Sequence, residues 1–360
     1  MKKTLIYPFD SYMEPIISQR SVYGEYVVDQ IVSSRSLGTC GKNVKLMDQN
    51  KEVVISRDYE KAVLETDAVV IVETQIPIDF EKAILPKIMI ALVNSKEVIY
   101  LKRVDEETKK ELENMGVKCL LPERMSGRFP EFEDVERKRF SIDIPVVAVV
   151  GAGENTGKFF AVTTMAQKLK EDGYKVSVVS ARPEGKLLGY YEFPINLFAG
   201  QYSDTLAVGI FNAFLKRIEV RDQADVIIIE IPGGVLALND YFVGDYGLLA
   251  YKTFCAVTPD TTVCTLYEGD YDEKFYDEIK KCMHYRFGVD VNYFTMNDVC
   301  IDPSTTREMG ELKYINVLPK LTDEAIKKVP KTIALYKMEK GEIIHLTNKV
   351  IDELAENPCI

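Results

Sequence analysis

The sequence predicts an α/β protein whose strands form parallel sheets covered by helices. Three observations support this fold class. Short apolar runs alternate along the chain with longer patterns that are typical of helices. Two of these runs, 146–150 and 226–229, are apolar at every position, which is typical of strands buried on both faces. The 360 residues, 46% of them hydrophobic, are enough for two domains with separate cores.

The composition excludes several functional classes. The net charge is −11 and no block of lysine or arginine stands out, so nucleic acid is not an expected partner. No apolar stretch is long enough to span a membrane, and Pro8, Asp10 and Glu14 interrupt the start before a signal-peptide core forms. We therefore expect a cytoplasmic protein. The 7 cysteines form no C-x-x-C pair and there are only 2 histidines, which favours reduced thiols and excludes a histidine-rich metal site.

A first domain is expected over 1–122, with a Rossmann-like parallel sheet. The alternation predicts strands at 4–7, 26–32, 67–72, 97–101 and 117–121, and helices after 8–11 and at 59–65, 82–93 and 106–115. Residues 123–143 carry prolines, a glycine and mixed charge without periodicity, and we interpret them as a linker. A second α/β domain is expected over 144–360.

The C-terminal ends of the strands in the first domain carry polar residues. Ligands bind at this edge in parallel sheets, so Asp10, the loop 33–42 and the segment 73–75 would line one rim. The alternative is that these segments are ordinary polar connections. Cys40 stands between two glycines and near Lys42, where a lowered thiol pKa would make it a nucleophile, although the sequence offers no basic partner.

The second domain begins with a strand, a glycine-rich loop and a helix. The apolar run 146–150 enters Gly-Ala-Gly-Glu-Asn-Thr-Gly-Lys at 151–158, and a helical pattern follows to 171. Such a loop turns its backbone N–H groups and a lysine toward phosphates, as in P-loop NTPases. In the spacing G-x-x-x-x-G-K-[ST], Gly157 and Lys158 fit, but Ala152 and Phe159 occupy the first and last positions. The candidate cofactor-binding residues are Gly153, Glu154, Asn155, Thr156, Gly157, Lys158, Phe159 and, just past the strand 175–180, Arg182.

The segment 225–234, DVIIIEIPGG, is the second informative feature. Glu230 directly follows a central strand, where P-loop proteins place the acid that organises Mg²⁺, so Glu230 is the candidate metal ligand. A strand-capping role is the alternative. Further strands are predicted at 254–258, 263–266, 289–294, 314–317 and 332–335, and helices at 158–171, 205–219, 272–287, 323–328 and 343–356. Asn297 and Asp298 follow one of these strands and would either read a purine base or form an Asx turn.

Together these segments resemble the "peptide maturation system" family. The resemblance is carried by the loop 151–158, by 229–234, and by 5–11 with 37–42. These proteins are encoded beside radical-SAM enzymes and small precursor peptides, so the resemblance implies a role in maturing a ribosomally made peptide, with such a peptide and maturase as partners. The second half more distantly resembles dethiobiotin-synthetase-like P-loop proteins. That resemblance implies that Glu230 binds Mg²⁺ and Lys158 the phosphates. Phe159 departs from the Ser or Thr of that branch.

Three functions remain open from the sequence. In the first, the protein binds ATP or GTP with Mg²⁺ and activates a carboxylate or similar group of a peptide. In the second, it is a non-catalytic partner or scaffold with a degenerate P-loop, which Phe159 favours. In the third, it is an acyl or group transferase whose loop binds a polyphosphate cofactor. The sequence leaves the enzymatic activity and the oligomeric state open.

Overall fold

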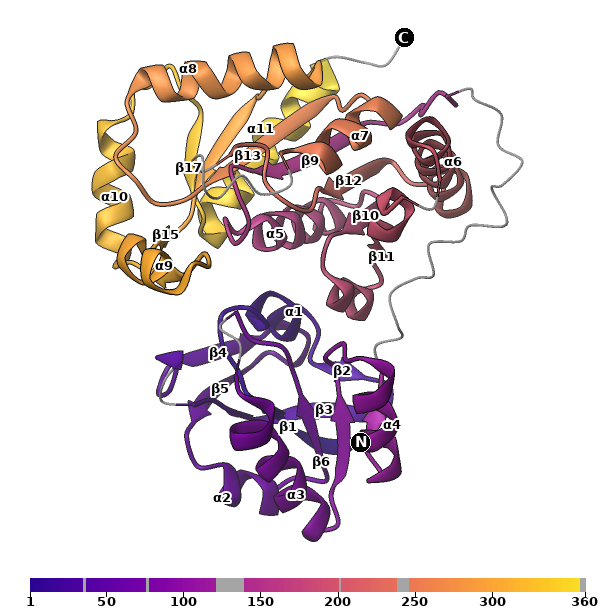
Figure 1. Ribbon diagram of the computed structural model, residues 1–360, viewed down its shortest axis with the longest axis vertical. Coiled ribbons are helices and arrows are strands. Elements are labelled where there is room, and N and C mark those ends of the chain that lie inside the picture. Colours follow the sequence, from indigo (N-terminus) through magenta and orange to yellow (C-terminus); the bar gives the residue numbers. More distant parts are fainter. Residues whose placement is uncertain (35–36, 76–77, 121–138, 201, 238–245, 357–360) are drawn as a thin grey trace. The chain divides into compact units, whose positions relative to one another are not determined.

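The computed structural model describes residues 1–34, 37–75, 78–120, 139–200, 202–237 and 246–356 (Figure 1). The chain divides into two compact units, Met1–Met125 with Pro183–Gly189, and Ser126–Arg182 with Tyr190–Ile360. Most of the predicted linker, 123–143, falls within 121–138 and so lies outside the described residues. In the part of the chain that the structure describes, no helix is both long and apolar enough to cross a bilayer.

The first unit is a Rossmann-like sheet with helices. Its strands are β1 (Lys2–Tyr7), β2 (Val22–Tyr23), β3 (Tyr26–Val32), β4 (Asn43–Leu46), β5 (Lys51–Ser56), β6 (Ala68–Ile71), β7 (Glu97–Tyr100) and β8 (Lys118–Cys119). Its helices are α1 (Glu14–Gln19), α2 (Tyr59–Leu64), α3 (Leu85–Val93) and α4 (Glu106–Asn114). The strand order is β4-β5-β3-β1-β6-β7-β8, in which β4 pairs antiparallel with β5. Counted along the chain, the parallel strands have the order 3-2-1-4-5-6 of Rossmann folds.

Local sequence explains where these elements begin. Asp58 caps α2 because its carboxylate accepts a hydrogen bond from the Lys61 amide, and Asp105 caps α4 in the same way through Thr108. Every residue of β6 is buried, as expected for a strand near the centre of a parallel sheet. The apolar sides of α2, α3 and α4 pack on β1, β6 and β7 in one hydrophobic cluster. The two glutamates in the first turn of α4 add a favourable interaction with the helix dipole.

The second unit is a parallel sheet between two layers of helices. Its strands are β9 (Val146–Gly151), β10 (Val176–Ser180), β11 (Tyr191–Glu192), β12 (Val226–Glu230), β13 (Thr261–Leu266), β14 (Tyr293–Met296), β15 (Val299–Ile301), β16 (Tyr314–Asn316) and β17 (Leu335–Lys337). Its helices are α5 (Lys158–Glu171), α6 (Asp204–Asp222), α7 (Leu248–Ala256), α8 (Glu273–Cys282), α9 (Pro303–Met309), α10 (Pro319–Lys328) and α11 (Lys340–Glu356). The order of the main sheet is β11-β10-β12-β9-β13-β14-β17, and β15 pairs antiparallel with β16 in a small separate sheet.

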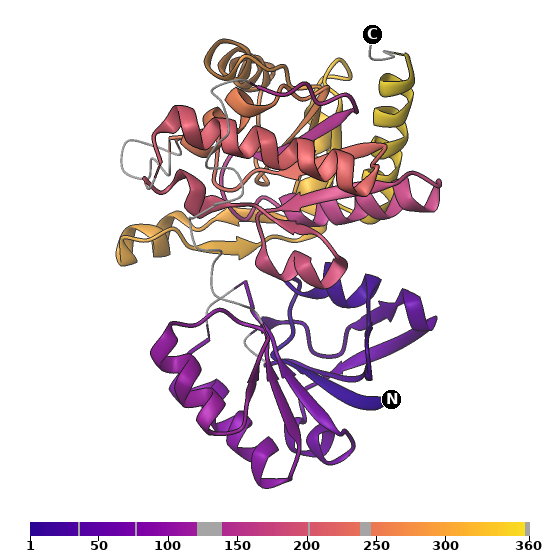
Figure 2. The ribbon, with the colours of Figure 1, turned by 90° about the vertical axis from the view of Figure 1, so that its right-hand side faces the viewer.

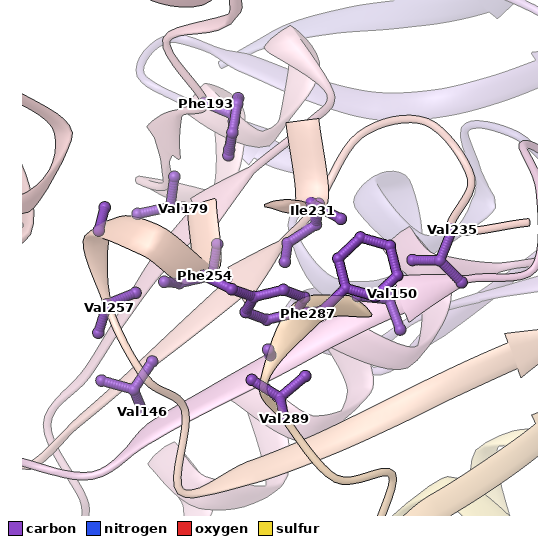
Figure 3. Packing of buried hydrophobic residues seen from close by; sticks show 14 of the residues in the cluster. Val146, Val150, Val179, Phe193, Ile231, Val235, Phe254, Val257, Phe287 and Val289 are labelled. Atoms are coloured by element: carbon purple, nitrogen blue, oxygen red, sulfur yellow. The ribbon is translucent and has the colours of Figure 1, made fainter. Parts of the chain in front are cut away.

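Side chains alternate along β9, so this strand packs against the helices on both faces of the sheet. Val146 and Val150 point into a cluster that contains residues of α6 and α7, and Figure 3 shows them beside Phe254 and Phe287. Val147 and Val149 face the opposite side, where α5 packs on the sheet and α11 packs on α5. Figure 2 shows the same unit from the side. Because β9 and β12 are neighbours in the middle of this sheet, the ends of both strands meet at one edge.

Several predicted elements are wrong or displaced. The expected strand at 254–258 lies largely in helix α7, because a short apolar run is equally compatible with a buried helix, and Phe254 packs against Phe287 with ring centroids 6.1 Å apart. The expected strand 289–294 begins only at Tyr293, and Val289 and Val291 are buried before it. The hairpin of β4 and β5 and the strand β15 were not predicted from the sequence, whereas β16 lies within the predicted strand 314–317.

Candidate functional site

The glycine-rich loop joins the end of β9 to the start of α5. Asn155 and Gly157 have φ angles of 58° and 89°, in the left-handed region, and Gly157 is the residue before the helix. Glycine relieves the strain of this conformation at 157, whereas Asn155 is among the residues that tolerate it. The first amides of a helix lack partners within the helix and attract anions, and here they directly follow the loop. The predicted strand, loop and helix are all present.

Lys158 is almost completely buried, with a relative exposure of 7%. Its ammonium donates hydrogen bonds to the carbonyl oxygens of Gly153, at 3.1 Å, and Gly233, at 2.7 Å. Lys158 thus connects the loop after β9 to the Pro-Gly-Gly segment after β12. The two segments are also joined through the backbone, because the Val235 amide donates to Gly151 O at 2.9 Å.

Gly234 lies directly against the loop. A Cβ atom at this position would lie 2.6 Å from Gly153 Cα and 2.8 Å from Ala152 O. Any larger residue at 234 would therefore push on the loop backbone. The Pro-Gly-Gly segment after β12 is consequently part of the site, in contact with the glycine-rich loop, and the absence of a side chain at 234 is a packing requirement.

Thr156 does not occupy the position of a metal-binding hydroxyl. Its side chain is fully buried, and its hydroxyl lies 2.6 Å from that of Thr265 on β13. Thr265 in turn donates to Val150 O at 3.1 Å, at the end of β9. The hydroxyl of Thr156 therefore ties the loop to β13.

Phe159 and Arg182 form a pair beside Lys158. Phe159 is the second residue of α5 and is 5% exposed, and the Arg182 guanidinium carbon lies 4.2 Å from the centroid of its ring. Arg182 follows β10, so two separate segments bring this pair together. Cation–π contacts of this kind hold a guanidinium in a defined plane and contribute about 0.5–2 kcal/mol. The sequence placed both residues among the candidates but gave no indication that they touch.

Glu230 is buried at the end of β12, with an exposure of 3%. Its Oε2 accepts hydrogen bonds from Ser180 Oγ at 2.8 Å and from the Ala181 amide at 3.0 Å. Burial raises the pKa of Glu230, and the Ser180 hydrogen bond and the charges of Lys158 and Arg182 partly oppose this rise. The structure thus joins the predicted metal ligand to the turn that carries Arg182. Among the described residues, no group of three or more His, Cys, Asp and Glu side chains is placed to hold a metal ion.

The other side of the loop contacts residues that follow β13 and β14. The Tyr267 hydroxyl donates to Glu154 O, and the Tyr267 ring stacks on Tyr314 with centroids 6.0 Å apart. Asn297 follows β14, and its Nδ2 lies 3.5 Å from Asn155 O. Sequence reasoning missed both tyrosines. The signal available in the sequence was that Tyr267 directly follows the predicted strand 263–266.

The polar residues at the rim of the first unit also come together. Asp10 accepts hydrogen bonds from the Tyr12 and Gln75 amides, both through its carboxylate, at 2.9 and 2.8 Å. Ser33 Oγ accepts from Thr39 Oγ1 at 2.8 Å, and the Cys40 thiol lies 3.5 Å from Ser33 O. Part of the predicted loop, 35–36, lies outside the described residues. A cavity of about 480 Å³ follows β6 and β7, and its lining includes Glu73 and Thr74 of the predicted rim together with Phe80, Tyr100, Lys102 and Arg103.

Comparisons with known proteins identify the fold. No protein-family profile and no curated sequence matches the chain. A DUF1611 family protein from Anabaena variabilis matches with a TM-score of 0.57 and 13% identity, over 99% of this chain and 100% of that one. A nucleotide-binding protein from Archaeoglobus fulgidus in complex with ADP matches with a TM-score of 0.35 and 15% identity, over 56% of this chain and 86% of that one.

Cobyrinic acid a,c-diamide synthase from Mycobacterium smegmatis, with bound ADP and magnesium, matches with a TM-score of 0.34 and 12% identity, over 60% of this chain and 98% of that one. These last two have P-loop NTPase-like folds. The likeness to the DUF1611 protein extends over almost the whole chain, and at such low identity it concerns the fold alone. The chain is thus a mixed α/β protein with parallel sheets, and its fold is similar to that of the DUF1611 family protein.

Proposed function

We propose that the second unit binds the pyrophosphate group of a nucleotide or a related cofactor in the loop 152–157. The buried ammonium of Lys158 is the observation that carries this proposal. It is held at the C-terminal edge of the sheet by the carbonyls of Gly153 and Gly233. An ammonium held between the glycine-rich loop and the segment after β12 has the place of a P-loop lysine, which contacts phosphate oxygens.

The surroundings of Lys158 supply the other groups that a phosphate requires. The left-handed conformation of Gly157 starts α5 directly at the loop, so the first amides of the helix and their dipole would face the anion. Glu154 and Asn155 are exposed at the outer side of the loop. Asn297, which lies next to Asn155, would contact the base of a bound nucleotide. The complexes of the neighbours with ADP are consistent with this assignment.

Binding of the ligand is the function that the site supports best. Phosphoryl transfer by a P-loop relies on a hydroxyl after the lysine and on a metal-holding acid, and Phe159 supplies no such hydroxyl. Activation of a carboxylate with ATP and acyl transfer with a polyphosphate cofactor therefore remain predictions. A role in peptide maturation, with a precursor peptide and a radical-SAM maturase, rests only on the sequence resemblance and remains a prediction as well.

Isothermal titration with ADP, ATP, GTP and an acyl-coenzyme A tests the proposal. We expect at least one of them to bind, and Lys158→Ala to weaken binding by about 1.5–3 kcal/mol, the cost of losing a charged hydrogen-bonding group. Lys168→Ala is the matched control, because Lys168 lies on the same helix and pairs with Asp172. Absence of binding to all four ligands, or equal binding by Lys158→Ala and wild type, would contradict the site assignment.

A further inference from the structure

The residues around the loop do not fit a P-loop magnesium site. The position after the loop lysine normally supplies a hydroxyl ligand, and here it is filled by the buried ring of Phe159. The nearest hydroxyl in the loop, that of Thr156, is committed to Thr265. A hard cation such as Mg²⁺ needs oxygen ligands with nearly octahedral geometry, and neither side chain provides one at the start of α5.

Glu230 has a different task from that of a metal ligand. Its carboxylate accepts hydrogen bonds from the Ser180 hydroxyl and the Ala181 amide. Ser180 Oγ in turn accepts a hydrogen bond from the Arg182 amide at 3.1 Å. Glu230 therefore fixes the turn that follows β10. The consequence is that the backbone of Arg182 is held at the edge of the sheet next to the loop.

The side chain of Arg182 lies over the residue that replaces the hydroxyl ligand. Its guanidinium packs on the ring of Phe159, 4.2 Å from the centroid, at the first turn of α5. Phe159 directly follows Lys158 at the start of α5, so the stacked guanidinium lies at the same helix turn as this lysine. A guanidinium is permanently charged and donates in-plane pairs of hydrogen bonds that match phosphate oxygens, which an ammonium does not.

We propose that Arg182, held by Phe159 and by the turn at Ser180, takes the place of the divalent cation, so that this site binds a pyrophosphate group without Mg²⁺. The inference rests on the proposed function of the loop. It assigns Phe159 a positioning role, namely to hold the plane of the guanidinium toward the phosphates that Lys158 and the loop amides contact. The ligand class is any molecule with a pyrophosphate, including nucleoside diphosphates and coenzyme A.

Titrations of the full chain with ADP and with coenzyme A, each in buffer with Mg²⁺ and in buffer with EDTA, test this proposal. For wild type we expect affinities that agree within about twofold between the two buffers for whichever ligand binds. Arg182→Lys should lose about tenfold or more in EDTA, because lysine keeps the charge but not the paired donors or the stacking. Phe159→Leu should lose less, about threefold to tenfold, because the guanidinium stays but its plane is no longer fixed.

Two further variants separate this role from general effects. Arg221→Ala removes a similar arginine–aromatic contact, over Tyr191 at the edge of the same sheet, and should bind like wild type. Phe159→Thr restores a hydroxyl and should make binding stronger in Mg²⁺ than in EDTA. Unfolding midpoints in urea establish that each variant is folded.

The outcomes distinguish this inference from the proposed function. Binding of wild type that requires Mg²⁺ would overturn the role of Arg182 and leave the phosphate site intact. Equal affinities of Arg182→Lys and wild type in EDTA would overturn it as well. If wild type binds neither ligand in either buffer, the inference fails, whereas the proposed function fails only if ATP, GTP and an acyl-coenzyme A do not bind either.

Discussion

Replacement of Gly234 by alanine should displace the glycine-rich loop. The added Cβ would lie 2.6 Å from Gly153 Cα, whereas ordinary contact begins at 3.4 Å. The loop backbone would therefore have to retreat by about 0.8 Å, since no flexible side chain is present to move instead. The backbone hydrogen bond from Val235 to Gly151 holds the two segments together and opposes this movement.

The expected magnitude follows from the cost of overpacking. A methyl group forced into a well-packed contact costs about 1–3 kcal/mol, which should appear as a lower free energy of unfolding. Lys158 bonds to carbonyls on both segments, so their separation should also weaken the geometry for phosphate. We expect the affinity for the ligand that binds wild type to fall about tenfold, the equivalent of one misplaced charged hydrogen bond.

Urea unfolding followed by circular dichroism and titration with that ligand measure the two effects. Gly341→Ala is the matched control, because nothing lies within 4 Å of the added Cβ and the residue stands in helix α11. It should leave binding unchanged and increase stability by up to about 1 kcal/mol. If Gly234→Ala unfolds at the same urea concentration as wild type and binds equally well, the contact between the two segments does not limit the site.

Three further predictions concern single side chains. Glu97 is partly desolvated, but hydrogen bonds led by that from Lys118 outweigh this effect and lower its pKa to about 2. Glu97→Gln should therefore lower the free energy of unfolding by about 1–2 kcal/mol at neutral pH, after allowance for solvent screening. Urea titrations should show this difference from wild type vanishing as the pH falls from 4.5 toward 2. Burial raises the pKa of Glu230, so the folded state holds this proton more tightly than the unfolded chain; the stability of wild type relative to Glu230→Gln should therefore fall as pH rises above 4.5, and a constant difference in unfolding midpoints would contradict the burial argument. Thr265→Val leaves the buried hydroxyl of Thr156 without its Thr265 partner and should lower the free energy of unfolding by about 1–2 kcal/mol, whereas an unchanged value would show that the pair contributes nothing.

The sequence by itself determined the elements that depend on local pattern. The apolar runs of β9 and β12, the glycines of the loop and the helix that starts at Lys158 are all found at or near their predicted positions. Such features can be predicted from the sequence because strands buried on both faces require continuous apolar runs, and because a left-handed turn before a helix favours glycine. The positions of Lys158 at the start of α5 and of Glu230 at the end of β12 follow from the same pattern.

Only the tertiary structure decided how those residues are used. The stacking of Arg182 on Phe159, the pairing of Thr156 with Thr265 and the hydrogen bonds that Glu230 accepts all join residues far apart in the chain. No periodicity in the sequence encodes such contacts, because they depend on which strands become neighbours. The error at 254–258 is related, because the apolar residues 254–256 are buried as the end of helix α7, where Phe254 contacts Phe287. The local sequence pattern determines the secondary structure and the loop. The chemistry of the site depends instead on the order of the strands, which brings the C-terminal ends of β9, β10, β12 and β13 to the same edge of the sheet.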